Sequence, residues 1–206
     1  MQIDVDKPVR RNTRLAGFDY TQAGAYFITV VVQDRVCVFG DVVDGEMRVN
    51  PAGEMVDAVW RELPAHYPGV KIDWHVVMPN HFHGIVVLTD ANERAVGAGP
   101  RARPQPNADE NGRPQGVAPT MGLSDVLQRF KSFTTNEYIR RVASDGWPPF
   151  SRHLWQRSFH DHIIRDDDDL ARAREYIALN PVRWADDEEN LANAREHERR
   201  MGGLMP

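Results

Sequence analysis

Apolar and polar positions repeat along the chain with two different periods, which predict strands and helices in turn. Segments rich in β-branched and aromatic residues predict strands, and they cover residues 25–33, 70–78, 81–88 and 159–165. Apolar residues spaced three and four apart predict helices, and they cover residues 51–67, 123–142 and 167–179. The chain is therefore expected to combine a sheet with several helices.

Turn and capping residues mark the places where several of these elements should begin. Asp44-Gly45 lies between two short strand-like stretches and predicts a β-hairpin, because such a turn needs residues that tolerate positive φ. Asn50 followed by Pro51 predicts the start of a helix. Asp166 predicts another helix start, and the acidic first turn that follows it suits the helix dipole.

The predicted elements follow in the order strand, hairpin, helix, strand, strand, helix, strand, helix. This order indicates an α+β fold, in which an antiparallel sheet is covered by helices on one face in a ferredoxin-like arrangement. Residues 90–122 are rich in proline and glycine, so we expect a mobile insertion within the domain there. The predicted division is a basic arm over 1–24, a main domain over 25–184 and a charged tail over 185–206.

The net charge of −5 argues mildly against a nucleic-acid partner, because phosphate binding depends on Lys and Arg. The acidic excess is local, however, since residues 166–206 carry 11 acidic and 6 basic side chains. Cys37 is the only cysteine, which excludes an internal disulfide and a cysteine-based zinc site. The polar N-terminus and the lack of a long apolar run predict a cytoplasmic protein that does not cross a membrane.

Two histidines on one predicted strand are the first candidates for chemistry. His81 and His83 are two residues apart, so both side chains should point to the same face of the sheet, while Phe82 points to the other. Two imidazoles on one face can serve as a pair of metal ligands. A pair of half-exposed strand histidines without a role is the alternative interpretation of this short pattern.

The second candidate site is the last predicted helix. Tyr176 and Asn180 are four residues apart, so they should share one face of that helix. The Asn180 carbonyl oxygen would suit a hard cation such as Mg²⁺ or Mn²⁺, and the Tyr176 phenol could attack an electrophile. The alternative is that Tyr176 is a core aromatic residue and that Asn180 only ends the helix.

A third segment, residues 154–165, is rich in groups that stack on bases and bind phosphate. Trp155 could stack on a base and Arg157 could bind a phosphate. The alternative is that Trp155 belongs to the core and that Arg157 and Arg165 are simply solvated.

Taken together, MPNHFHGIVV, LWQRSFHDHIIRD and AREYIALNPVRW resemble the single-tyrosine HUH transposases, and among them the REP-associated tyrosine transposases. FITVVVQDR also resembles the first strand of that family, so the resemblance covers residues 25–184 apart from the insertion. It implies that this range is the catalytic domain and that Tyr176 is the nucleophile. It also implies that His81, His83 and Asn180 hold a divalent metal, Mg²⁺ or Mn²⁺.

The activity implied by the resemblance is cutting and rejoining of single-stranded or hairpin-bearing DNA through a 5′-phosphotyrosine intermediate. The protein would act as a monomer or as a homodimer that exchanges the tyrosine helix. The predicted DNA-binding residues are Arg10, Arg11, Arg14, Lys131, Trp155, Arg157 and Arg165.

Several alternatives stay open on the sequence alone. The chain could be a catalytically silent nucleic-acid-binding regulator on the same scaffold, or a structural domain without a site. It could also be an unrelated metal hydrolase that uses His81, His83 and an acid such as Asp161. Tyr138 is the rival nucleophile that deserves a control.

Overall fold

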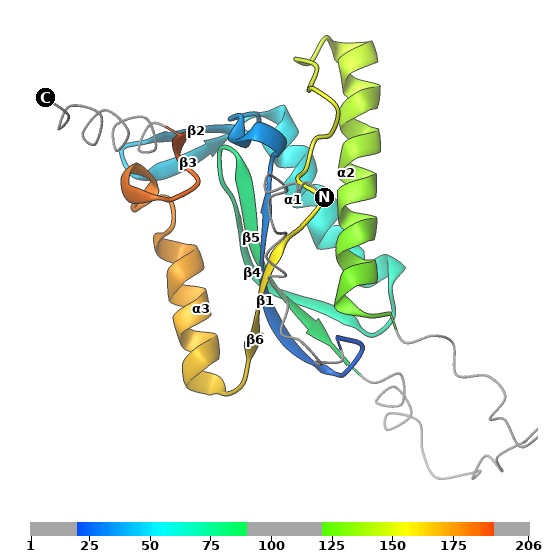
Figure 1. Cartoon of the computed structure of the whole chain (residues 1–206), viewed down its shortest axis with the longest axis vertical. Coiled ribbons are helices and arrows are strands. Elements are labelled where there is room, and N and C mark those ends of the chain that lie inside the picture. Colours follow the sequence, from blue (N-terminus) through cyan, green and yellow to red (C-terminus); the bar gives the residue numbers. More distant parts are fainter. Residues whose placement is uncertain (1–19, 90–120, 192–206) are drawn as a thin grey trace, which may run out of the picture.

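The computed structural model describes residues 20–89 and 121–191 of the chain (Figure 1). Six strands and three α-helices account for most of this part of the chain. The strands are β1 (Gly24–Val31), β2 (Gly40–Val43), β3 (Glu46–Val49), β4 (Val70–Val77), β5 (His81–Leu88) and β6 (His160–Ile164). The helices are α1 (Pro51–His66), α2 (Leu123–Asp145) and α3 (Asp167–Leu179). None of the helices described is long and apolar enough to cross a membrane.

The main sheet has four strands in the order β4-β5-β1-β6, and all neighbouring strands are antiparallel. The chain runs from β1 through the β2–β3 hairpin and helix α1 to β4, at one edge of the sheet. Helix α2 follows β5 and precedes β6, the strand at the opposite edge. This is the strand order and connectivity of a ferredoxin-like sheet. The predicted α+β class with an antiparallel sheet and packed helices is therefore confirmed.

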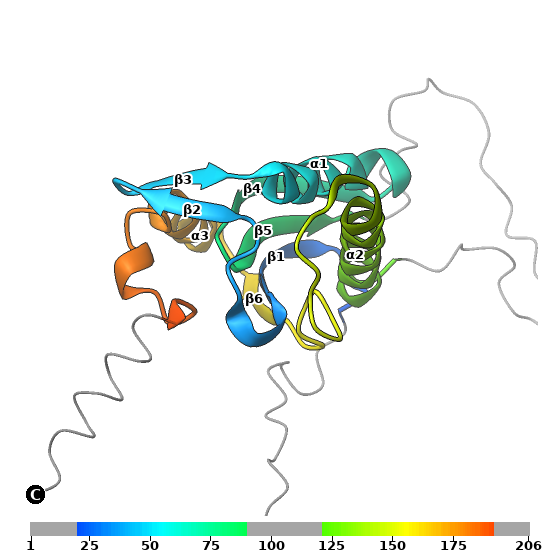
Figure 2. The same ribbon diagram turned by 90° about the horizontal axis from the view of Figure 1, so that it is seen from above.

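The helices are divided between the two faces of the sheet. Helices α1 and α2 lie together on one face, and α3 lies on the other (Figures 1 and 2). Strand β5 shows why: Phe82 and Val86 join the core under α1 and α2, whereas Ile85 packs with Ala173 and Ile177 of α3. The expectation that all helices share one face was therefore wrong for α3, because β5 is apolar on both faces and both need cover.

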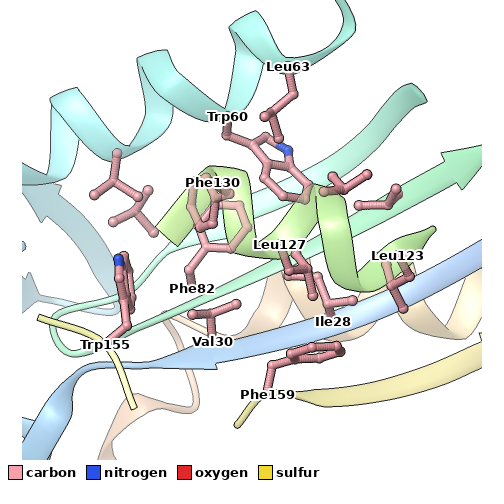
Figure 3. Packing of buried hydrophobic residues seen from close by; sticks show 14 of the residues in the cluster. Ile28, Val30, Trp60, Leu63, Phe82, Leu123, Leu127, Phe130, Trp155 and Phe159 are labelled. Carbon is pink, nitrogen blue, oxygen red and sulfur yellow. The ribbon is translucent and has the colours of Figure 1, made fainter. Parts of the chain in front are cut away.

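The larger core consists of aromatic and aliphatic side chains between the sheet and helices α1 and α2 (Figure 3). The Trp60 ring centroid lies 4.7 Å from that of Phe82 and 5.2 Å from that of Phe130, so α1, β5 and α2 meet at this point. A Cβ atom at Gly84 would lie 2.7 Å from Trp60 Cζ2. The glycine after the histidine pair therefore lets the indole pack directly against β5.

The predicted local signals are found at the expected places. The Asn50 side chain accepts hydrogen bonds from the backbone N–H groups of Ala52 and Gly53 at the start of α1. Asp166 accepts one from the Asp169 N–H at the start of α3. Strands β2 and β3 form a separate hairpin, and Asp44 and Gly45 take positive φ in its turn. These interactions depend only on nearby residues, which is why the pattern could predict them.

Candidate functional site

His81 and His83 lie side by side on β5, on the face that α3 covers. Their ring centroids are 4.5 Å apart, and both side chains are buried. The partner of His83 across the sheet is Thr29 on β1, which places Thr29 on the same face. The predicted pairing of the two imidazoles on one face is thus present in the structure.

Asn80 fixes the orientation and the protonation of His81. The Asn80 Nδ2 group donates to the carbonyl oxygens of Arg35, at 3.0 Å, and Glu189, at 2.7 Å. Its Oδ1 atom must therefore accept from His81 Nδ1, which lies 2.9 Å away. In a neutral imidazole this leaves His81 Nε2 with a free lone pair.

Thr29 orients the second imidazole in a similar way. Its Oγ1 atom lies 2.8 Å from His83 Nδ1, so this ring also turns its Nε2 atom away from the sheet partner. A hydrogen bond at the ring nitrogen that does not bind the metal is the usual means by which proteins orient a metal-binding histidine. Phe27 stacks on the His83 ring at 5.4 Å between centroids and holds its plane.

Three polar atoms of this site are buried without a hydrogen-bond partner: His81 Nε2, His83 Nε2 and Asn180 Oδ1. Unpaired buried polar groups are costly, so their gathering in one place calls for an explanation. Asn180 Oδ1 and His81 Nε2 carry a lone pair, and His83 Nε2 carries one when its Nδ1 donates to Thr29, so all three can act as metal ligands. A bound cation would satisfy all three atoms together, in keeping with the predicted ligand set.

Asp187 is a further oxygen donor that the sequence analysis did not single out. His81, His83 and Asp187 each offer a ligand atom, and these atoms all lie within 4.8 Å of one another. Residues from 185 onward were assigned to a charged tail, yet Asp186, Asp187, Glu188 and Glu189 line the same pocket as His83. Four successive acids shortly after the tyrosine helix were the available signal, but their approach depends on how the chain turns after α3.

Helix α3 brings Tyr176 to the histidines within one copy of the chain. The Tyr176 ring lies 5.2 Å from that of His83 and 5.6 Å from that of Phe27, edge-on to both. Ala173 and Ile177 pack against Ile85 on the inner side of the helix. No helix exchange is needed to bring the phenol and the two imidazoles together, although the oligomeric state stays a prediction.

The Tyr176 phenol opens onto a pocket of about 510 Å³, which His83 and Asn180 also line. Tyr176 is 41% exposed, whereas Asn180 is almost fully buried one helical turn later. The Arg174 guanidinium donates to Asp73 on β4 at 2.5 Å and so ties α3 to the sheet edge. The arrangement leaves the Tyr176 side chain accessible to a substrate beside the buried donors.

The electrostatics of the site keep both imidazoles neutral. Burial lowers the pKa of His81, and the nearby charge of Asp187 opposes this shift in part. Burial lowers the pKa of His83 well below its ordinary value, and His81 adds to the effect. Neutral imidazoles are the form that binds metals.

These shifts predict that, with metal removed by EDTA, the free energy of unfolding falls as the pH decreases from about 7 toward 5. The folded-state pKa of each histidine is depressed, so the unfolded chain takes up protons first, below the ordinary value of 6.5. Stability is therefore present above that value and lost as the pH falls. Each histidine contributes at most about 1.4 kcal/mol per pH unit.

Urea unfolding at several pH values would measure this slope. The double variant His81→Leu/His83→Leu should show a shallower dependence than the wild type, because its two buried titrating groups are gone. Equal slopes in the two proteins would contradict the prediction.

Tyr176 is protonated near neutral pH. Burial raises the pKa of its phenol, and the charges of Asp187 and Glu188 raise it further. A hydrogen bond with Asn180 and the charge of Arg183 act in the opposite direction. A cation close to the acids would remove part of their effect, so cation binding and phenol ionisation favour each other.

Two of the predicted DNA-binding residues make structural contacts within the chain. Trp155 is 4% exposed, and its Nε1 donates to Thr134 Oγ1 at 2.8 Å within the core (Figure 3). It is not available to stack on a base, so that prediction was wrong, because the pattern could not separate a core indole from a surface one. Lys131 Nζ donates to the carbonyl oxygens of residues 156 to 158, which holds that loop.

Of the other predicted DNA-binding residues, some lie in the described part of the chain and some do not. Arg157 and Arg165 are exposed, so both can reach a phosphate. Arg10, Arg11 and Arg14 lie outside the described residues, as does nearly all of the predicted insertion over 90–122. The DNA-binding roles of these arginines stay predictions.

The hydrolase alternative with Asp161 conflicts with the register of the sheet. Asp161 pairs with Ile28, whose side chain lies in the core under α1 and α2. Cross-strand partners share a face, so Asp161 points away from His81 and His83. His160 instead pairs with Thr29 and lines the pocket.

No family model matches the chain. Comparison with known proteins does give related sequences. An uncharacterised protein of Haemophilus influenzae is 32% identical over 183 residues, which are 87% of this chain and 92% of the relative. A second protein of the same organism, named "Putative REP-associated tyrosine transposase", is 26% identical over 165 residues, which are 80% of this chain and 74% of the relative.

Two solved structures are similar at a lower level. One, a REP-associated tyrosine transposase bound to a REP hairpin, has a TM-score of 0.47 and 20% identity, with 81% of this chain and 71% of that chain covered. The other, described as a "putative transposase" from Deinococcus radiodurans, has a TM-score of 0.42 and 15% identity, with 80% and 95% covered. Both TM-scores are too low to add to the assignment.

The similarity to the second relative agrees with the motifs found in the sequence. His83, Tyr176 and Asn180, which the family resemblance singled out, line one pocket in this chain, and the His81 ring lies next to that of His83. The chain is similar in sequence to a putative REP-associated tyrosine transposase, and this similarity supports a role related to DNA transposition.

Proposed function

We propose that the protein cuts and rejoins single-stranded DNA with Tyr176 as the nucleophile and a divalent cation at His81 and His83. One observation carries the proposal: the accessible Tyr176 phenol lies in one pocket with His83, whose unpaired, buried Nε2 atom belongs to a ring packed against that of His81. A nucleophile next to a Lewis-acid site is an arrangement suited to phosphoryl transfer.

The donor atoms fit a divalent cation. His81 Nε2 and His83 Nε2 would supply two ligands, and the oxygens of Asn180 and Asp187 are the candidates for a third. Oxygen donors favour Mg²⁺ or Mn²⁺, while the two imidazoles would also suit other transition metals. When bound, the cation would polarise the phosphodiester and offset the charge that develops on its oxygens.

The residues of the chain then perform a transesterification. The Tyr176 oxygen attacks phosphorus, which forms the tyrosyl–phosphate bond and breaks the bond from phosphorus to the 3′ oxygen. The phenolic proton is released, and the departing 3′ oxygen gains one, so the overall step conserves protons. Because one ester replaces another, the 3′-OH of a second strand can reverse the reaction and rejoin DNA.

We propose a hairpin-bearing single strand as the substrate, in keeping with the sequence similarity to a putative REP-associated tyrosine transposase. The acidic residues around the pocket do not attract phosphate, so the DNA must be held mainly by basic groups outside it. Arg157 and Arg165 are exposed and carry this role in our proposal, together with Arg10, Arg11 and Arg14.

A covalent-adduct assay tests the proposed function. The protein is incubated with hairpin-bearing single-stranded DNA and Mg²⁺ or Mn²⁺, and an SDS-resistant protein–DNA adduct is expected. After nuclease and trypsin digestion, mass spectrometry should place the nucleotide on the peptide of residues 175–183, in which Tyr176 is the only tyrosine.

The other functions predict different results in the same assay. A catalytically silent regulator would shift the DNA in a gel without an adduct. A metal hydrolase would cleave the DNA without a covalent intermediate, and a structural domain would do neither. An adduct located on another peptide would overturn the role of Tyr176.

A further inference from the structure

Arg183 continues the face of α3 that carries Tyr176 and Asn180. Although α3 ends at Leu179, the Arg183 N–H donates to the carbonyl oxygens of Leu179 and Asn180, each at 3.1 Å. One more turn therefore follows the helix, and Arg183 stands seven residues after Tyr176 and three after Asn180. These spacings place the three residues on one side, and all three line the same pocket.

The charge of Arg183 is exceptional in this pocket. Among the described residues that line it, Arg183 is the one Arg or Lys, against four carboxylates from Asp186 to Glu189. Arg35, which also reaches this acidic segment, is bound in an ion pair with Glu189. In the described part of the chain the Arg183 side chain takes part in no ion pair that the structure records, and it is exposed.

We infer that Arg183 binds the phosphate that Tyr176 attacks and holds it against the phenol. The inference rests on the proposed function and deepens it. A guanidinium presents several N–H donors to the two non-bridging oxygens of a phosphodiester, and it remains charged at any relevant pH. The residue would thus contact both the scissile phosphate and the tyrosyl phosphodiester that replaces it.

A second arginine provides a comparison for Arg183. Arg183 lines the pocket together with Tyr176 and Asn180. Arg172, on α3, pairs with Asp169 and is absent from the pocket lining. The two arginines therefore offer a matched comparison, one inside the pocket and one outside it.

Binding of a small diester tests the inference without requiring DNA cleavage. The probe is the 4-nitrophenyl ester of thymidine 5′-phosphate, which carries the aryl phosphodiester of the proposed intermediate. NMR titration in the presence of Mg²⁺ would give its dissociation constant. Arg183→Gln should weaken binding by about 10-fold or more, the range expected for a lost charge-assisted hydrogen bond.

Three controls make the measurement specific. Arg183→Lys should restore part of the affinity, because it keeps the charge without the planar fork. Arg172→Gln should bind as the wild type does. The corresponding uncharged methylphosphonate ester should bind wild type and Arg183→Gln equally. Unchanged diester binding in Arg183→Gln, or an equal loss for the uncharged ester, would overturn the inference.

The adduct assay separates this inference from the proposed function. If wild type forms the Tyr176 adduct but diester binding does not depend on Arg183, only the inference fails. If no adduct forms while diester binding still depends on Arg183, the nucleophile role fails and the phosphate site stands.

Discussion

Changing Tyr176 to phenylalanine is expected to lower the initial rate of covalent protein–DNA adduct formation at least about 1,000-fold. The variant removes the attacking oxygen and keeps the ring, so the edge-on contacts with Phe27 and His83 can persist. The adduct is quantified on denaturing gels with labelled hairpin DNA. Metal binding and thermal stability should stay close to those of the wild type.

Tyr138→Phe is the matched control for this substitution. Tyr138 is buried in the core, and its hydroxyl donates to the Pro148 carbonyl oxygen at 3.0 Å. Its loss should affect stability by about 1 kcal/mol and leave the chemistry intact. An adduct that survives in Tyr176→Phe, or one that disappears in Tyr138→Phe while the fold is retained, would disprove the assignment of the nucleophile.

The sequence predicted the elements whose signals are local. Asn50, Asp166 and the Asp44-Gly45 turn each satisfy backbone groups a few residues away, so their effect can be inferred from neighbours in the chain. The strand order also followed, because a hairpin-linked pair between two helices leaves few ways to complete an antiparallel sheet.

Features that depend on packing between residues far apart in the sequence were harder to predict. The position of α3 on the second face follows from the apolar residues on both faces of β5, a pattern that also suits a buried helix segment. Trp155 in the segment after α2 is apolar and aromatic, which fits a core and a base-stacking surface equally well. In both cases the tertiary contacts, and not the local pattern, decide the outcome.

The candidate site divides along the same line. His81, His83, Tyr176 and Asn180 could be named from spacing and resemblance, because each lies on a regular element whose geometry is known. Asp187 could not, since it reaches the histidines through an irregular turn. The role of Asn80 was equally hidden, because its amide is fixed by carbonyl groups from residues 35 and 189.

The second large effect is expected at the proposed cation site, where His83→Leu should weaken Mn²⁺ binding by at least about 100-fold. Loss of an outer-shell partner alone typically costs 10- to 100-fold in affinity, so loss of a ligand should cost at least as much. Isothermal titration calorimetry measures the affinity directly. His162→Leu is the control, because His162 is exposed on β6 and pairs with Asp169 outside the pocket.

The stability of the same variants distinguishes lost coordination from a damaged fold. A ligand that binds only the native state raises the unfolding free energy by about 2.7 kcal/mol at 100 times its dissociation constant. Mn²⁺ should therefore raise the melting temperature of wild type and His162→Leu but not that of His83→Leu. In EDTA the His83→Leu protein should differ from wild type by only about 1 kcal/mol, because leucine removes the hydrogen bond with Thr29 but also a buried nitrogen that has no partner without metal. If Mn²⁺ stabilises His83→Leu as much as wild type, the buried nitrogens do not form the cation site, and the cleavage mechanism loses its basis.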